Sequence, residues 1–198
     1  HPPGELFVGE RERRRVIHYI AAGQTYSYDT EISDSTREGF GRAVAADSQY
    51  ILIGAVDSNL SEGSVHLYVR SGGGFMEADA VVSMVDNNQL GREVFLDGDT
   101  AVAFAVDGAH VYDLSAGTLA EVQVIPEAIY TGGYDADTIV ALDSSDDTMG
   151  GIVRVFRRST DTFALEATLA AADFEEINSF LDAVAVDEAL DAAGIEGD

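Results

Sequence analysis

One stretch of the chain, residues 39–70, contains three short apolar runs separated by polar turns, and weaker copies recur on both sides. The first run follows Phe40-Gly41, and the second ends at Gly54-Ala55. Short runs of apolar residues bounded by Gly, Asp and Ser are typical of β-strands. Because a module this small cannot bury its own faces, a chain of such copies must stack them into a repeat fold.

The copies divide the chain into units of roughly 40 to 50 residues, each with four short strands. Leu90-Gly91 stands where Phe40-Gly41 stood, and residues 179–187 repeat residues 39–47. We expect one domain over residues 1–198, made of a partial unit at 5–38, units at 39–88, 89–127 and 128–178, and a partial unit at 179–198.

This period predicts an all-β fold, a β-propeller of four-stranded antiparallel blades. If the two partial units join, the ring has about four blades; otherwise the chain is an arc of a larger ring. Residues 174–195 are the ambiguous part, because their Ala, Leu and Glu content also suits an amphipathic helix. The repeat register favours strands there.

The formal net charge is -25, and all eleven basic residues are Arg. Such a surface repels nucleic acid and anionic membranes, so we expect neither as a partner. No apolar run approaches the length of a membrane helix, which predicts no membrane insertion. An acidic surface without Lys suits a halophilic or marine protein, with GC-rich codon bias as the alternative explanation.

The best-preserved motifs are Phe40-Gly41, Ile53-Gly54-Ala55 and the run from Gly63 to Tyr68, with partial copies at Leu90-Gly91 and at residues 151–156. In these motifs the chain resembles the FG-GAP repeat family, whose blades also build the head of integrin alpha subunits. The resemblance implies a propeller that binds other proteins or mediates adhesion. Val56 stands where the family pattern has Pro.

Many members of that family hold calcium in a loop between the first two strands, and this chain departs from them. Its turns at Asp47, Asp97, Asp135 and Asp187 are too short to supply six to eight oxygen ligands. We expect plain hairpin turns there and transfer no metal site. The acidic stretch 143–147 is long enough for a weak calcium loop, although a solvated acidic loop is the favoured interpretation.

Four histidines, and no cysteine, limit the chemistry that the chain can offer. His66 and His110 occupy matching third-strand positions, Arg154 takes that position in the next unit, and His18 is one position out of register. A metal pair is one interpretation of His66 and His110. The recurrence is better explained by the repeat, because matching positions lie a full blade apart.

Other residue groups have a functional and a structural interpretation. The tyrosines at 26, 28, 50, 68 and 112 could form a carbohydrate platform, but aromatic residues on alternating strand positions more often pack between blades. Arg11 and residues 13–15 could bind an anion, but the interleaved Glu residues favour a solvated turn. Gly72-Gly73-Gly74 lacks the Lys and the helix of a phosphate loop.

No nucleophile elbow, zinc-protease pair or dinucleotide fingerprint is present, so we assign no catalytic, cofactor-binding or metal residues and expect no cofactor. We expect a non-catalytic module for protein–protein interaction or surface adhesion, with a protein or glycan partner and an extracellular or cell-surface location. The alternatives are a polysaccharide hydrolase or lyase on a propeller scaffold, and a structural subunit of a larger complex whose other chains complete the partial blades.

Overall fold

A computed structural model describes residues 4–56, 62–126, 131–143 and 152–170. In this part of the chain, every regular element except the short 3₁₀ helix η1 (Arg11–Arg13) is a β-strand. The predicted all-β fold is therefore confirmed. No helix in the described ranges is long and apolar enough to cross a membrane. Residues 174–195 and 144–147 lie outside the described residues.

The strands form four antiparallel sheets, and strand order follows the sequence in each of them. The first sheet has three strands, β1 (Glu5–Glu10), β2 (Arg15–Ala22) and β3 (Thr25–Ser33). The second has four, β4 (Phe40–Ala46), β5 (Tyr50–Ala55), β6 (Ser64–Ser71) and β7 (Gly74–Val82). The third contains β8 (Glu93–Asp97), β9 (Thr100–Phe104), β10 (Ala109–Asp113) and β11 (Ala120–Ile125). The fourth contains β12 (Thr131–Asp135), β13 (Thr138–Asp143), β14 (Ile152–Ser159) and β15 (Thr162–Ala170).

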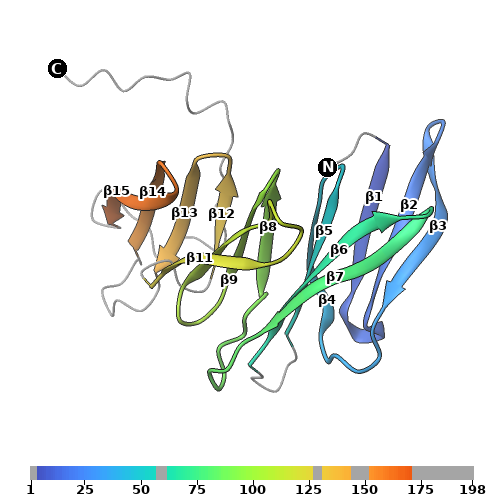
Figure 1. The fold of residues 1–198 in the computed structure, drawn as a ribbon, viewed down its shortest axis with the longest axis horizontal. Helices are drawn as coiled ribbons and strands as arrows, with labels where there is room; N and C mark the ends of the chain where they lie inside the picture. Colours follow the sequence, from blue (N-terminus) through green and yellow to red (C-terminus); the bar gives the residue numbers. More distant parts are fainter. Residues whose placement is uncertain (1–3, 57–61, 127–130, 144–151, 171–198) are drawn as a thin grey trace, which may run out of the picture.

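The sheets stand side by side in a row, with the first sheet at one end and the fourth at the other (Figure 1). Each sheet contacts the next mainly through the strands nearest the start of each unit, as in the pairs β1 with β4, β4 with β8 and β8 with β12. The row is open over the described residues. The expected stacking of four-stranded units is present, and the described strands by themselves do not form a closed ring.

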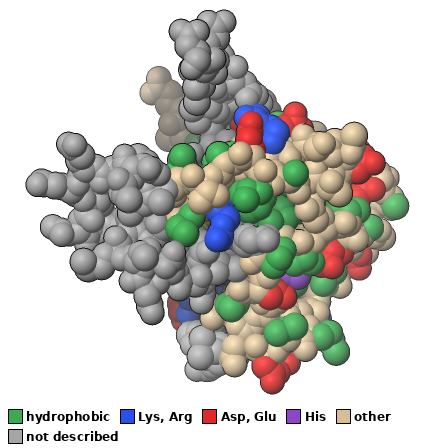
Figure 2. Space-filling model, turned by 90° about the vertical axis from the view of Figure 1, so that its left-hand side faces the viewer, with side chains coloured by type: hydrophobic (Ala, Val, Ile, Leu, Met, Phe, Trp, Pro, Cys, Tyr) green, Lys and Arg blue, Asp and Glu red, His purple; other side chains and the backbone are tan. Residues whose placement is uncertain are grey.

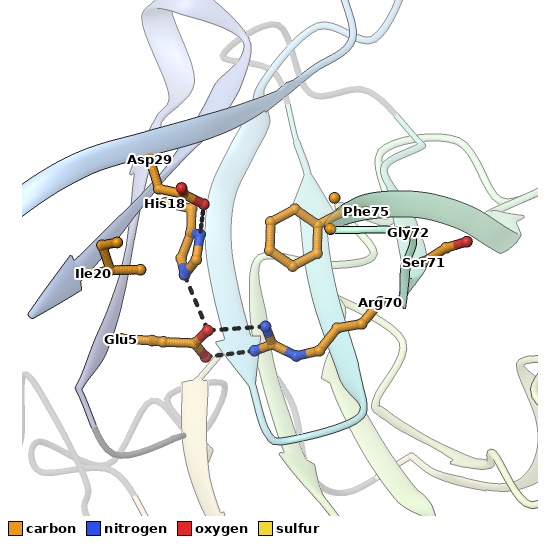
Figure 3. Close-up of a pocket in the computed structure, with 10 residues that line it drawn as sticks. Glu5, His18, Ile20, Asp29, Arg70, Ser71, Gly72 and Phe75 are labelled. Carbon is orange, nitrogen blue, oxygen red and sulfur yellow. Dashed lines mark hydrogen bonds and ion pairs between the residues drawn. The ribbon is translucent and has the colours of Figure 1, made fainter.

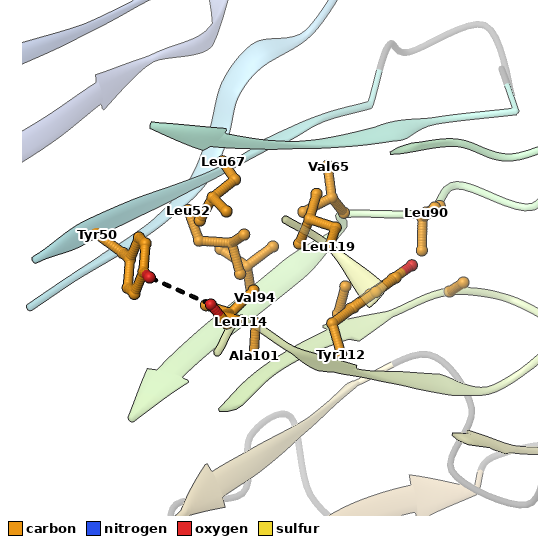
Figure 4. Close-up of a cluster of buried hydrophobic side chains, with 12 residues drawn as sticks. Tyr50, Leu52, Val65, Leu67, Leu90, Val94, Ala101, Tyr112, Leu114 and Leu119 are labelled. Carbon is orange, nitrogen blue, oxygen red and sulfur yellow. Dashed lines mark hydrogen bonds between the residues drawn. The ribbon is translucent and has the colours of Figure 1, made fainter. Parts of the chain in front are cut away.

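Three apolar clusters fill the spaces between successive sheets, because alternate side chains of a strand point to opposite faces. Phe7, Phe40, Ile51 and Ile53 lie in the first space, and Phe104, Ile139 and Phe156 lie in the third. The central cluster between the second and third sheets is the largest (Figure 4). Its buried members are Tyr50, Leu52, Val65, Leu67, Leu90, Val94, Ala101, Ala103, Ala105, Tyr112, Leu114 and Leu119.

Glycines of the sequence motifs lie where the backbones of neighbouring sheets meet. A Cβ on Gly54 would clash with the carbonyl oxygen of Gly91, and a Cβ on Gly9 would clash with that of Gly41. Gly41 and Gly91 also have φ values of +83° and +87°, which L side chains rarely adopt. The Phe-Gly, Leu-Gly and Gly-Ala motifs therefore recur because they allow two backbones to come into contact.

The third and fourth sheets solve the same problem differently. Phe104 of β9 takes the place of the β5 glycine, since it stands opposite Ala109 of β10 as Gly54 stands opposite Val65 of β6. Its ring fills the space where Gly132 of β12 has no side chain. A large residue on one sheet is thus matched by a glycine on the next.

Candidate functional site

Histidine–carboxylate pairs recur in three of the four sheets and connect the last two strands of each. The ring Nδ1 atoms of His18, His66 and His110 lie 3.0, 2.7 and 2.7 Å from oxygens of Asp29, Glu77 and Glu121, respectively. In every pair the carboxylate follows the histidine by eleven residues. Each pair lies beside a β-bulge, where one extra residue shifts the register and aims the acid at the ring.

The predicted equivalence of His66, His110 and Arg154 is confirmed by the strand pairing. They stand opposite Ile53, Ala103 and Ala141 on the second strands of their sheets. His18 is displaced by one position, because it is Ile17 that stands opposite Val8 in this register. A displacement of one residue moves the side chain to the other face of the sheet.

The two equivalent histidines do not form one site, since each has its own partners. The Nε2 atom of His66 lies 2.9 Å from the hydroxyl of Ser64, and that of His110 lies 2.9 Å from Asp107. The described ranges contain no group of three or more His, Asp and Glu side chains arranged to hold a metal ion. The recurrence is explained by the repeated strand geometry.

His18 faces a pocket of about 360 Å³ between the first and second sheets (Figure 3). Arg70, at the end of β6, reaches into this pocket and forms a bidentate ion pair with Glu5 of β1, at 3.0 and 2.6 Å. The Nε2 atom of His18 lies 3.3 Å from the same carboxylate. Asp29, His18, Glu5 and Arg70 therefore form a continuous chain of polar contacts that crosses from one sheet to the next.

Aromatic rings enclose this polar chain. The His18 ring stacks on Phe7 at 4.6 Å and meets Phe75 edge-on at 5.3 Å, and His18 is only 4% exposed. The Arg70 guanidinium lies over both Phe rings, at 5.9 and 5.5 Å from their centroids. Such contacts stabilise a cation against an apolar wall. The arrangement holds the two sheets together.

Chemically, the pocket offers no unengaged cation for an anionic ligand. The Gly-rich turn at Gly72 and Gly73 forms one wall, and Arg70 is the one arginine of the lining. Because Glu5 already neutralises Arg70, an anion would have to displace that carboxylate. We assign the pocket a structural role in joining the sheets.

A second hollow, of about 380 Å³, lies beside Arg13, Arg14 and Arg15. Arg15 is held by Glu10 and Glu31, each at 2.7 Å, and the hydrogen bond that Arg15 donates to Glu10 is the main reason that the pKa of Arg15 is raised. Arg14 lies 3.2 Å from Glu38, and Arg13 lies 3.6 Å from Glu10. Acidic neighbours therefore pair all three arginines.

The aspartate turns are hairpins, as expected. The Oδ1 atom of Asp47 accepts the backbone N–H groups of Gln49 and Tyr50, both at 2.7 Å. Asp137, in the turn between β12 and β13, lies 3.3 Å from Arg158. The turn between β8 and β9 is equally short. The fourth turn, at Asp187, lies outside the described residues.

The tyrosines fall into two groups. Tyr50, Tyr68 and Tyr112 are at most 7% exposed and pack between sheets as predicted, and burial raises the pKa of Tyr68 to about 12. Tyr26 and Tyr28 are 52% and 61% exposed, so the prediction that they pack between blades is wrong. They lie on the face of the first sheet that points away from the second, where no other described sheet stands.

Sequence reasoning missed a braced apolar loop between β7 and β8. The side chain of Asn88, a residue only 2% exposed, donates to the hydroxyl of Ser83 at 3.0 Å and accepts the backbone N–H of Asp107 at 3.0 Å. The loop that it fixes presents Met84, 92% exposed, and Val85, 52% exposed, to solvent. Its one sequence signal is a pair of apolar residues before the turn residues Asp86-Asn87-Asn88.

In comparisons with known proteins, no family model matches the chain and no curated protein matches it. The structure gives a physical role to the sequence motifs Phe40-Gly41 and Gly54-Ala55. Gly41 and Gly54 lie where a Cβ would clash with the backbone of a neighbouring sheet, and Phe40 fills the space between the first two sheets.

Proposed function

We propose that the chain is part of an FG-GAP-like β-propeller that acts as a module for protein–protein interaction or surface adhesion. Three features support this. The described strands stack as four-stranded antiparallel units, the motif glycines lie at the contacts between units, and the ionisable groups of both pockets are paired with one another.

The observation that most supports a binding role is the exposed apolar loop at Met84 and Val85. Exposed apolar side chains on a flexible loop would be unremarkable, but this loop is held by Asn88 and Ser83 through hydrogen bonds on both sides. A fixed loop that displays large apolar side chains is suited to binding, because little conformational entropy is lost when a partner covers it.

Charge defines the partner further. Acidic and apolar side chains are interspersed over the described surface at the fourth-sheet end of the row (Figure 2), and the net charge of the chain is -25. A complementary partner is a protein with an apolar pocket and a basic rim. Binding at the cell surface, outside the cell, agrees with this proposal.

The test is site-specific photo-crosslinking with surface proteins extracted from the source organism. A photoreactive residue in place of Met84 should give a discrete adduct, whereas the same residue in place of Met76, 56% exposed on β7, should not. Val85→Asp should reduce the yield at least tenfold. Its matched control is Val122→Asp, because Val122 is 48% exposed and lies on β11, outside the loop.

An adduct that survives Val85→Asp, or that forms equally from position 76, would contradict the proposal. So would turnover by the purified protein of one member of a panel of polysaccharides, if His18→Gln abolished it. That second result would instead support the hydrolase or lyase alternative.

A further inference from the structure

β1 is the counterpart of β5, β9 and β13, the second strands of the other sheets. Val8 stands opposite Ile17 in the first sheet, as Ile53 stands opposite His66 in the second. Gly9 meets Gly41 of the following sheet, as Gly54 meets Gly91. Each of the three counterparts is paired on both sides, whereas among the described strands β1 is paired with β2 alone. Within the part of the chain that the structure describes, the first sheet therefore has no strand that corresponds to β4.

The unpaired side of β1 is also apolar. Leu6 and Val8 are 38% and 37% exposed, whereas their counterparts Ile51 and Ile53 are fully buried. The strand pairing places Tyr28 on the same face, which points away from the second sheet. An exposed strand edge with apolar neighbours is a template for another strand.

The sequence contains one segment outside the described residues with the pattern of the missing strand. Residues 179–187 carry Phe180, Ala183, Val184, Ala185 and Asp187 at the positions of Phe40, Ala43, Val44, Ala45 and Asp47 of the β4 region. Leu181 stands at the position that Gly41 holds before β4. The fourth unit has Ile129 at this position, and its first strand, β12, still pairs with β13. We propose that residues 179–187 of a second copy of this chain pair with β1 and complete its first sheet.

A second copy fits better than the same chain, because the segment follows β15 at the far end of the row (Figure 1). The eight residues 171–178 let the chain span at most about 30 Å. Three sheet spacings of about 10 Å each already use that length, and the path must also go around the fourth sheet. The contact is head-to-tail, so that two copies form a ring if the rotation closes and a filament if it does not.

The register follows from the second sheet, where Val44 stands opposite Ile53 and Ala46 opposite Ile51. Val184 should therefore stand opposite Val8, and residue 186 opposite Leu6. Both valines of the incoming strand would cover the exposed apolar face of β1. This interface does not involve the loop at Met84, so the two proposals can fail independently.

Disulfide trapping tests the register, since the chain has no cysteine of its own. Directly opposite residues in an antiparallel pair lie about 4.5–5.5 Å apart at Cα, within disulfide range. Mixing full-length Val8→Cys with full-length Val184→Cys under mild oxidation should give a disulfide between the two tagged copies. The matched mixture of Val8→Cys with Ala185→Cys should give at least tenfold less, because residue 185 points to the other face.

Absence of the disulfide between positions 8 and 184 would overturn the proposal. So would a chain carrying both Val8→Cys and Val184→Cys that forms this disulfide only within itself. Light scattering adds a second measurement. The wild-type chain should be dimeric or larger, and Val184→Asp should make it monomeric while the far-ultraviolet spectrum stays that of a β-protein. A wild-type chain that is monomeric at high micromolar concentration would also overturn the proposal.

Discussion

The space between the first and second sheets differs from the space between the second and third in what it buries. The second space is almost wholly apolar, with Leu52, Leu67 and Tyr112 fully buried and the Tyr50 hydroxyl donating to the carbonyl of Leu114 at 3.2 Å (Figure 4). The first space contains His18 and an ion pair between Glu5 and Arg70 (Figure 3).

One strand pattern thus supports two kinds of contact. Apolar burial is nondirectional and resists salt, whereas an ion pair depends on both of its partners and is screened. The comparison teaches that the repeat fixes where sheets meet, while single substitutions on β1, β2 and β6 decide which forces join them. Four experiments can break or sharpen this contrast.

The largest effect is expected in the apolar space. Leu67→Ala should lower the free energy of unfolding by about 2–5 kcal/mol, because the cavity cannot be refilled by neighbours from two rigid sheets. Denaturant unfolding measures the loss. Leu165→Ala is the control, since Leu165 is 54% exposed, and it should change stability by less than about 0.5 kcal/mol. Equal effects of the two substitutions would contradict the assigned core.

In the polar space the expected loss is smaller and depends on the partner. Arg70→Met should cost about 1–3 kcal/mol, since it leaves the carboxylate of Glu5, 20% exposed, without its cation. Adding Glu5→Gln should recover part of this loss, because no buried charge then remains unpaired. Additive losses in a double-mutant cycle would show that the pair contributes no coupling energy.

Salt screens two interactions with opposite effects on stability, the self-repulsion of the whole chain and the ion pair in the first space. A chain with a net charge of -25 should gain stability when salt screens its self-repulsion, which the halophilic proposal requires. We expect the wild-type Tm to rise between 0.1 and 2 M NaCl, and to rise further in Arg70→Met, which has no ion pair to lose to screening. Each kcal/mol corresponds to about 2–4 °C in a domain of this size. A flat Tm would favour codon bias as the origin of the composition.

Much of this contrast could not be predicted from the sequence. The alternation of apolar residues and the Asp and Gly turns predicted the strands and hairpins, because these depend on local geometry. The polar contacts of Glu5 with Arg70 depend on which faces of two sheets meet, and the two residues are 65 positions apart. The pattern of a few neighbouring residues does not show which residues so far apart in the sequence come into contact.

The tyrosines show where the limit lies. Tyr28 and Tyr68 both lie on strands, β3 at the end of the first sheet and β6 within the second. Tyr68 is covered because the first sheet packs on its face, whereas Tyr28 lies on the outer face of that first sheet. Exposure is decided by the presence of a neighbouring sheet, which no window of residues around either tyrosine contains.

The smallest effect is expected on stability at alkaline pH, where the burial of Tyr68 and the exposure of Tyr28 can be compared by experiment. Burial, followed by the charge of Glu77, raises the pKa of Tyr68 from 10 to about 12. The folded state therefore keeps a proton that the unfolded state loses, so stability that is present below pH 10 should decline as the pH rises toward 12. Unfolding curves from pH 9 to 11.5 should show a shallower decline in Tyr68→Phe, which has no phenol to ionise. Tyr28→Phe, altered at a residue 61% exposed, should keep the wild-type profile. A profile that changes with Tyr28 and not with Tyr68 would mean that the first sheet does not cover the second as described.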